Sequence, residues 1–490
     1  MADTRGIGAL TKSGTARIVT GVLAALLLVS APTGPVSAES LRQALSAAYK
    51  FNPRLDAERA RLRATDEEVP RAKSGYRPQI FGSADAGYQH QRTRGSGGFN
   101  DNAETHPRGY GVDLSQPIFS GFRTTNAVRE AEATVRSGRA NLHVIEQSVL
   151  LEAVIAYADV VRDQAVVRLR ENNVNVLTRE LRAAQDRFNV GEVTRTDVAQ
   201  ATARRAGAVS ALDLARGNLR TSRASYERVI GHPPSNLADP GVPERYMPKS
   251  QSDALAIAGR ENPNIVAALY REQAARHVVD RVWGELLPEV TLNASYDKRF
   301  GQSDTISESE TTQVTGRVTV PIYQGGEVSA RVRQAKHTHV SRLQEVEQMR
   351  TEAQADVVAS WSLVQASRAQ LVSDSAQVEA NTTALTGVRE EERVGQRTVL
   401  DVLNAELELL NAQVNLVTTR RDLSVNAYGL LASIGRLGAE HLNLGPEVYD
   451  PEAHYFEVRR KWYGISITHA DGRREEIDTW ETSGQVAPSK

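Results

Sequence analysis

The chain has 490 residues and a formal net charge of −1, and a charge this close to zero gives no electrostatic reason to expect a nucleic acid as the partner. It contains no cysteine, which excludes disulfides, thiolate metal sites and cysteine nucleophiles. Only 5% of the residues are aromatic and alanine is abundant, so the composition favours long helices packed side by side over a thick aromatic core.

Residues 1–38 have the pattern of a secretory signal peptide. Basic residues precede an apolar run from Ile18 to Val29, and the small residues at Val36–Ala38 fit a cleavage site. The apolar run is too short for a transmembrane anchor, and no other stretch reaches about 18 apolar residues. We therefore expect an exported protein that begins at Glu39 and that can cross a membrane only with strands.

The rest of the chain contains an internal repeat. Asn52-Pro53 recurs as Asn262-Pro263, and the segment Pro-Ile-Phe-Ser-Gly at 117–121 recurs as Pro-Ile-Tyr-Gln-Gly at 321–325. A repeat of about 200 residues indicates duplication of a whole structural unit rather than a solenoid. We assign residues 39–237 to the first repeat, 238–445 to the second and 446–490 to a C-terminal periplasmic extension.

Each repeat opens with a helical run, Ser40–Gly75 or Ser252–Leu287, that leads into two strands. Apolar and polar residues alternate in the strands, and polar, glycine-rich loops join them at 94–107 and 301–310. A solvent-exposed hairpin is one interpretation, but two such copies between long helices favour strands of a water-filled membrane barrel. Four strands cannot close such a barrel, so the chain must oligomerise. The expected strands are residues 79–89, 108–117, 289–299 and 312–321.

A long helix without proline follows each strand pair, from about Gly121 to Val190 and from about Gly325 to Val394. Each would be about 105 Å long at 1.5 Å per residue. Apolar residues recur every seven positions, which indicates coiled-coil packing. A shorter helix follows each long one and ends at Ile230 or Ile434. The length of this shorter helix plus the length of the helical run before the strands equals the length of one long helix. We therefore expect two short helices to lie end to end beside each long one.

Two turns of the same form connect the long and short helices. Each contains a glycine, which can adopt the left-handed conformation that ends a helix. In each, a threonine is followed three residues later by an aspartate, as in a capping box that starts the next helix. Capping alone therefore accounts for Thr194 and Asp197 in the turn 190–198, and for Thr398 and Asp401 in the turn 394–402.

These features resemble the TolC-like outer-membrane efflux and type I secretion family. The resemblance extends to about Leu437 and rests on the paired Val-Gly-x-x-Thr-x-x-Asp-Val turns, the paired strand exits and the element order. It implies an α plus membrane β-barrel fold, in which a homotrimer in the cell outer membrane forms a 12-stranded barrel continued by a coiled-coil tunnel into the periplasm. The implied function is an exit duct for efflux or type I secretion. The implied partners are a periplasmic adaptor (membrane fusion) protein, an inner-membrane pump or ABC transporter, and outer-membrane lipid.

The resemblance also implies that the two turns form a periplasmic tip that contacts the adaptor and narrows the pore. By position, Asp401 matches an acidic residue that lines the closed entrance. Arg397 matches a residue that ties the second hairpin to Thr196 and Asp197 of a neighbouring chain. The implied adaptor-contacting residues are Val190, Gly191, Thr194, Val394, Gly395 and Thr398.

The sequence departs from the family pattern at two of the implied gate positions. Asn404 replaces a second acidic residue one helical turn after Asp401, which removes one ring of negative charge. Glu392 replaces a tyrosine of the gate, and we expect it to be an alternative partner for Arg397.

Other functions find less support. The sequence has no Walker loop, strand-linked GxGxxG, HExxH or GxSxG motif, so we expect no enzyme activity, cofactor or metal site. A periplasmic coiled-coil adaptor or scaffold without a channel stays open, as does a surface adhesin with a trimeric stalk. In the C-terminal extension, Tyr455–Tyr463 is basic and aromatic, Ile465–Ile477 is a candidate hairpin, and 482–490 is expected to be disordered.

Overall fold

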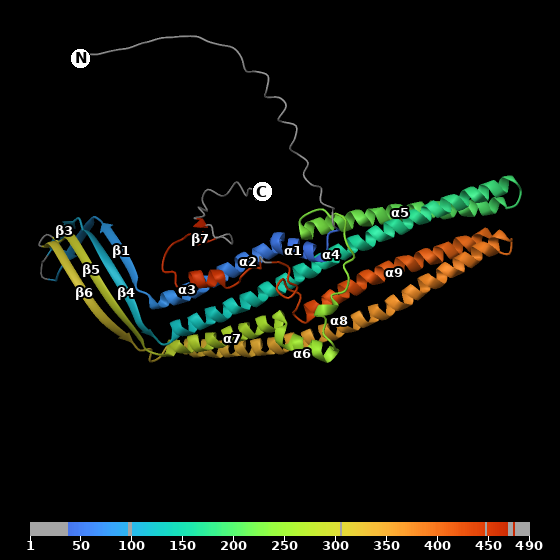
Figure 1. Cartoon of the computed structure of the whole chain (residues 1–490). Helices are drawn as coiled ribbons and strands as arrows, with labels where there is room; N and C mark the ends of the chain where they lie inside the picture. Colours follow the sequence, from blue (N-terminus) through green and yellow to red (C-terminus); the bar gives the residue numbers. More distant parts are fainter. Residues whose placement is uncertain (1–37, 97–99, 304–305, 446–447, 469–473, 476–490) are drawn as a thin grey trace, which may run out of the picture.

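The computed structural model describes residues 38–96, 100–303, 306–445, 448–468 and 474–475. A four-stranded sheet lies at one end of an elongated molecule, and a bundle of long helices runs away from it (Figure 1). The expected signal peptide up to residue 37 and the expected disordered end at 482–490 lie outside the described residues.

Two helical hairpins make up most of the bundle. The long helices are α4 (Arg123–Asn189) and α8 (Glu327–Arg393), each of 67 residues. Helix α5 (Arg195–Ile230) packs against α4, and α9 (Val399–Ser433) packs against α8. The seven-residue apolar spacing places side chains between the paired helices, and the buried ones include Val357, Val364 and Leu385 of α8 and Val402, Leu423 and Leu430 of α9.

The helical run before each strand pair is broken, so the expectation of one continuous helix was wrong. One break in each repeat falls where an asparagine precedes a proline, at Asn52 and Asn262, and the first repeat is broken again at Glu67. Proline has no N–H to donate and restricts the residue before it to extended conformations, so a helix cannot continue through this pair. The segments are α1 (Leu41–Phe51), α2 (Pro53–Asp66), α3 (Glu68–Lys73) and a 3-10 turn (Ser74–Tyr76) in the first repeat, and α6 (Gln251–Glu261), α7 (Pro263–Trp283) and a 3-10 turn (Gly284–Leu286) in the second.

Each of these asparagines joins three helix ends within its own repeat. Asn52 Oδ1 accepts a hydrogen bond from the Arg54 N–H at 3.0 Å, and Asn262 Oδ1 accepts one from the Asn264 N–H at 2.9 Å. The same side chains donate to the ends of the hairpin helices, Asn52 to the Val229 carbonyl at 3.2 Å and Asn262 to the Ser433 carbonyl at 2.8 Å. Only α2–α3 and α7 therefore run on along the long helices toward the sheet, while α1 and α6 stay beside the ends of α5 and α9.

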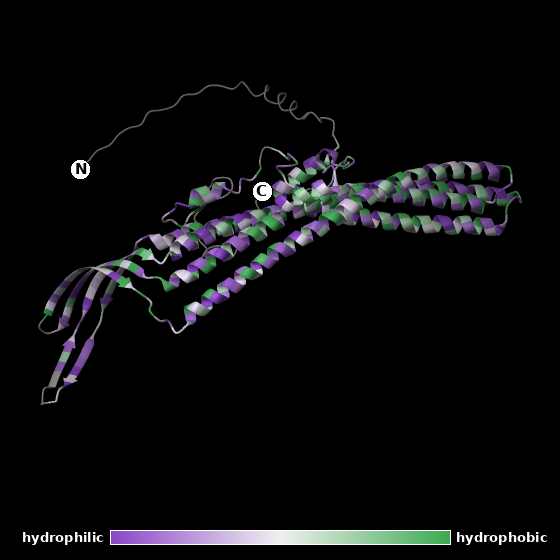
Figure 2. Cartoon of the chain, turned by 90° about the horizontal axis from the view of Figure 1, so that it is seen from below, coloured by the Kyte–Doolittle hydropathy of each residue, from purple (hydrophilic) through white to green (hydrophobic). Residues whose placement is uncertain are grey.

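The main hydrophobic core lies where these helix ends meet, at mid-length of the bundle. Figure 2 shows hydrophobic residues gathered at this level. Glu39, the expected first residue of the mature chain, is held here because its carbonyl accepts a bond from Tyr157 at 2.7 Å and its carboxylate one from Tyr226 at 2.8 Å. Buried residues of this core include Leu41, Leu45, Tyr157, Tyr226, Leu430, Ile434 and Leu437.

The four strands form one antiparallel sheet in the order β1 (Gln79–Ala86), β4 (Arg108–Ser120), β5 (Glu289–Ser303) and β6 (Ile306–Thr319). The register aligns the alternation of all four strands, because Ile80 lies opposite Leu114, Val112 opposite Tyr296 and Val290 opposite Val318. One face is therefore apolar over the part of the sheet nearest the helices, and it is at least partly exposed in the single chain, whereas Lys298, Glu308 and Glu310 stand on the same face farther out. The opposite face carries polar residues, including Asp113, Asn293, Thr315 and Arg317.

The loops that were expected at 94–107 and 301–310 are largely strands. Within the first, β3 (Asn100–Thr105) pairs with β2 (Gln89–Arg94) as a separate ribbon. Within the second, β5 and β6 continue to Ser303 and Ile306. Polar composition suggested loops, but antiparallel pairing satisfies backbone groups whatever the side chains are. Opposite charges also face across the second hairpin, where Lys298 Nζ lies 2.5 Å from Glu308.

The C-terminal extension packs against the first repeat. Its helix α10 (Ala453–Val458) lies beside α2 and α3 (Figure 1). Strands β7 (Ile467–Thr468) and β8 (Arg474–Glu475) pair antiparallel where a hairpin was expected, and the turn between them lies outside the described residues. Among the described residues, no helix combines the length and the apolar character that crossing a membrane requires.

Gly435 gives a direct test of the helix junction. Its φ is +90°, and a Cβ at this position would lie 2.4 Å from the Glu261 carbonyl oxygen. We expect Gly435→Ala to destabilise the protein by about 2 kcal/mol or more, because both the left-handed backbone and the contact resist a side chain. The control Gly387→Ala, in an exposed helical position with open space, should not lower stability. Thermal unfolding followed by circular dichroism measures both, and equal midpoints would contradict this account.

Candidate functional site at the helical tip

The two turns lie together at the end of the bundle that is farthest from the sheet (Figure 1). Gly191 and Gly395 have φ values of 83° and 77°, the left-handed conformation that ends α4 and α8. The Gly191 N–H donates to the Phe188 carbonyl at 3.0 Å, and the Gly395 N–H donates to the Glu392 carbonyl at 2.9 Å. Each turn therefore has a fixed backbone shape.

A capping box begins each of the following helices. Thr194 Oγ1 accepts from the Asp197 N–H at 3.3 Å, and Asp197 accepts from the Thr194 N–H at 2.9 Å. In the second turn Thr398 Oγ1 accepts from the Asp401 N–H at 3.2 Å, and Asp401 accepts from the Thr398 N–H at 3.0 Å. The Thr398 backbone and hydroxyl hydrogen bonds lower the pKa of Asp401 below its ordinary value. The capping role expected from the sequence is present in both turns.

The tip also exposes apolar side chains. Val190 and Val394, which end the two long helices, are 72% and 70% exposed. Thr194 and Thr398 are exposed beside them, together with both glycines. The two turns have the same backbone conformation, so the tip presents this set of exposed residues twice.

Two polar contacts join the hairpins to each other near the tip. Arg187 of α4 forms an ion pair with Glu392 of α8, and this carboxylate raises the pKa of Arg187. Arg204 of α5 donates to Asn404 of α9 at 2.9 Å. These two contacts, which we call the tip contacts, link residues 205 and 200 positions apart in the sequence.

The expected pairing of Arg397 with Glu392 was wrong. Arg397 Nε lies 2.8 Å from Glu391, within its own hairpin, and Glu392 is occupied by Arg187. Glu391 faces the turn that carries Arg397, whereas Glu392, one position on, points to the first hairpin because successive helical residues lie about 100° apart. The contact of Arg397 with Thr196 and Asp197 of a neighbouring chain stays a prediction.

Arg187 and Arg204 were not identified from the sequence, although a signal was present. At the repeat offset of 204, Arg187 corresponds to Glu391 and Arg204 to Glu408. The two hairpins therefore carry opposite charges at equivalent positions. A comparison of charge between the repeats would have drawn attention to these two arginines, although not to their partners, which are Glu392 and Asn404.

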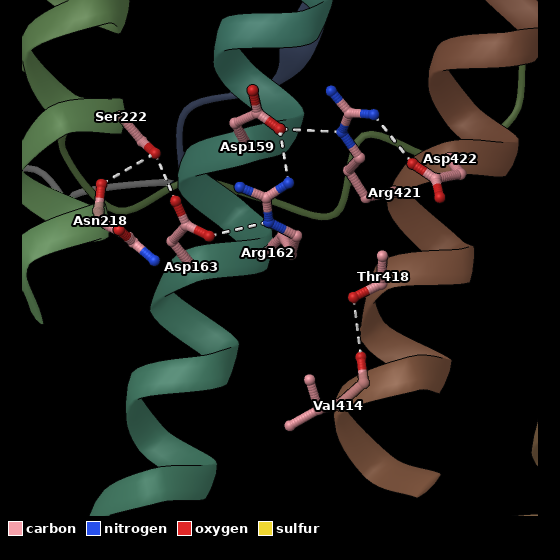
Figure 3. A network of polar contacts seen from close by, with 9 residues as sticks. All are labelled: Asp159, Arg162, Asp163, Asn218, Ser222, Val414, Thr418, Arg421 and Asp422. Carbon is pink, nitrogen blue, oxygen red and sulfur yellow. Dashed lines mark hydrogen bonds and ion pairs between the residues drawn. The ribbon is translucent and has the colours of Figure 1, made fainter. Parts of the chain in front are cut away.

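A third polar contact joins the hairpins closer to mid-length (Figure 3). Arg421 Nε of α9 lies 2.8 Å from Asp159 of α4, and Arg162 lies 3.1 Å from the same carboxylate. Arg162 also pairs with Asp163 at 2.8 Å, and Asp163 accepts a hydrogen bond from Ser222 of α5. Separating α9 from α4 at this level would break the Arg421–Asp159 pair, although Asp159 would keep Arg162 and Arg421 would keep Asp422, from which it lies 2.8 Å.

Other kinds of site are not evident in the described part of the chain. No group of three or more histidine, aspartate or glutamate side chains there is arranged to hold a metal ion. At the tip, Glu392, Arg397 and Asp401 are instead paired with other side chains or with backbone groups.

Comparisons with known proteins agree on one family. The model of the family described as "Outer membrane efflux protein" matches residues 44–232 and 255–436. The outer membrane efflux protein BepC of Brucella suis biovar 1 (strain 1330) is 39% identical over 460 residues, covering 92% of this chain and 98% of that protein. The outer membrane protein TolC of Escherichia coli (strain K12) is 27% identical over 425 residues, covering 83% and 84%. The solved structure of the Campylobacter jejuni CmeC outer membrane channel has a similar fold, with a TM-score of 0.73 at 17% identity over 86% of this chain and 89% of that one.

The lowered pKa of Asp401 predicts how the second turn depends on pH. A carboxyl group whose pKa is lowered by folding stabilises the fold above its ordinary pKa, and this contribution is lost as the pH falls through the lowered value. We expect hydrogen exchange at residues 399–402, corrected for intrinsic rates, to become faster below about pH 4. In Asp401→Asn the same amides should exchange faster already at pH 7, with a weaker pH dependence. Equal exchange in both proteins at pH 7 would contradict the capping role.

Proposed function

This chain belongs to the outer membrane efflux protein family, and we propose that it works as a homotrimeric exit duct that rests closed at its helical tip. It is an outer-membrane channel of the efflux and type I secretion class, with a helical tunnel that extends into the periplasm. Substrates would pass from periplasm-spanning machinery through the tunnel and the strands to the outside.

The register of the sheet carries this proposal. All four strands present apolar residues on one face and polar residues on the other, which suits lipid outside and water inside. Strands β1 and β6 each have one unpaired edge, and unpaired backbone groups are not tolerated in hydrocarbon. Pairing β6 of one copy with β1 of the next satisfies both edges, and three copies give twelve strands.

The tip is the proposed site of closure. In a trimer, three copies of Asp401 would surround one axis near the end of the tunnel and attract cations there. Arg397 would bind Thr196 and Asp197 of the next protomer. Asn404 and Glu392, at the two positions that depart from the family pattern, are held by Arg204 and Arg187 within one protomer. We therefore propose that this chain relies on contacts between its own two hairpins to stay closed.

The same tip would bind the partners. A periplasmic adaptor protein would contact the two exposed turns, and an inner-membrane pump or ABC transporter would deliver the substrate. Exposed apolar residues with a fixed backbone give such a partner a surface to bury at low conformational cost. The residues proposed for this contact are Val190, Gly191, Thr194, Val394, Gly395 and Thr398.

The channel itself is tested by the mass and conductance of the detergent-extracted protein. We expect a trimeric mass and, in planar lipid bilayers, a small and steady conductance that prefers cations. Asp401→Ala should weaken the cation preference, because it removes the negative charge at the narrow end. A soluble monomer without bilayer activity would refute the exit duct and favour a coiled-coil scaffold.

The closing role of the tip contacts is tested by removing and then restoring charge. We expect Glu392→Ala to raise the single-channel conductance several-fold, because Arg187 then no longer holds the second hairpin. The control Arg216→Ala removes an ion pair with Glu171 inside the first hairpin and should leave conductance unchanged.

The double variant Arg187→Glu with Glu392→Arg keeps the pair with its charges exchanged and should return the conductance toward that of the unaltered protein. If the single and double variants conduct alike, the ion pair does not hold the tip closed.

A further inference from the structure

We propose that residues 455–467 of the C-terminal extension form a membrane-interface anchor that binds anionic phospholipid at the periplasmic surface of the outer membrane. The proposal rests on the outer-membrane location of the channel. It concerns a segment that lies beyond the residues matched by the family model, which end at 436.

The extension runs alongside the first repeat toward the sheet, and three contacts fix its course. His454 lies 3.1 Å from Asp66 at the end of α2. The Arg459 carbonyl accepts a hydrogen bond from Lys73, the last residue of α3, at 3.3 Å. The Trp462 ring lies against the Arg77 guanidinium, with 4.7 Å between the guanidinium carbon and the ring centroid. The three residues of the extension contact their partners in the same order along the chain, so the extension runs in the same direction as α2 and α3, toward the strands.

Trp462 is thereby placed at the level where the sheet begins. Arg77 precedes the first residue of β1, Gln79, by two positions, and the apolar face starts at Ile80. Other aromatic residues surround the same end of the sheet and are exposed in the single chain. They include Tyr76 before β1, Phe122 after β4, Trp283 before β5 and Tyr323 after β6. Aromatic residues collect at the level of the headgroups in membrane barrels, and Trp462 continues this band.

The composition of the segment matches a membrane surface. Tyr463 and Ile465 are 91% and 86% exposed although both are largely apolar. Arg459, Arg460 and Lys461 stand directly before Trp462, and among the described residues no carboxylate pairs with Arg460. Basic side chains next to exposed aromatic ones are typical of segments that lie in the interface of an anionic bilayer.

The segment is also held firmly enough to serve as an anchor. Val458 is buried, and Tyr455 packs on a small core that includes Val69 and Val135. Arg139 of α4 pairs with Glu452 and stacks on Tyr455, with 5.0 Å between the guanidinium carbon and the ring centroid. The inner side of the extension is therefore attached to the helices, while its outer side offers aromatic and basic groups.

Fluorescence quenching by lipid tests the anchor on the full chain. The protein is placed in bilayers that contain brominated phosphatidylglycerol or brominated phosphatidylcholine, and the signal of Trp462 is obtained by subtracting that of Trp462→Phe. We expect strong quenching of Trp462 in phosphatidylglycerol and weaker quenching in phosphatidylcholine. The triple variant Arg459→Gln, Arg460→Gln and Lys461→Gln should lose the difference between the lipids. The matched variant Arg182→Gln, Arg220→Gln and Arg223→Gln, on α4 and α5, should keep it.

Two further readouts separate the anchor from the channel. Trp283 should be quenched in every variant, because it lies at the end of α7 and is not part of the extension. The conductance of the triple variant should be unchanged. If Trp283 is quenched while Trp462 is not and stays open to acrylamide, the segment does not bind lipid, and a protein partner becomes the better account of its exposed face. If neither tryptophan is quenched, the protein is not inserted, and both the anchor and the proposed function are overturned.

Discussion

The need to pair every backbone group in the hydrocarbon of a membrane governs the whole molecule. A sheet of four strands with an apolar face and two open edges is incomplete, and only further copies of the chain can complete it. Closing the strands into a ring also places the helices that follow them in a ring. The polar faces of these helices then enclose water, so closing the barrel also forms the tunnel.

The fold was predictable where the sequence is periodic. Alternation gave β1 and β4 to within a few residues, and the long stretches without proline gave α4 and α8. The prediction of element boundaries failed where individual residues interrupt the apolar pattern. Asn52 and Asn262 each end a helix that the apolar pattern would continue. Around Ser303 the residues are polar and were expected to form a loop, but backbone pairing extends β5 and β6 through them.

The tip was predictable only in part, for a related reason. The capping boxes lie within four residues, so Thr398 and Asp401 could be paired from spacing alone. The partner of Glu392 could not, because Arg187 lies in the other repeat and the geometry of two packed hairpins decides which acid it meets. Two adjacent acids, Glu391 and Glu392, point in different directions, and a sequence alone does not show which one faces the neighbouring hairpin.

Duplication followed by divergence explains why the hairpins hold together. Two identical hairpins side by side would place equal charges at equivalent positions along their contact, which is unfavourable. Arg187 instead meets Glu392, and Arg204 meets the amide of Asn404, so the contact between the hairpins is attractive while the turns and caps stay alike. In a ring of three chains each hairpin has two neighbours, one in its own chain and one in the next. The charge difference between repeats allows these two contacts to differ in strength, so one can open while the other holds.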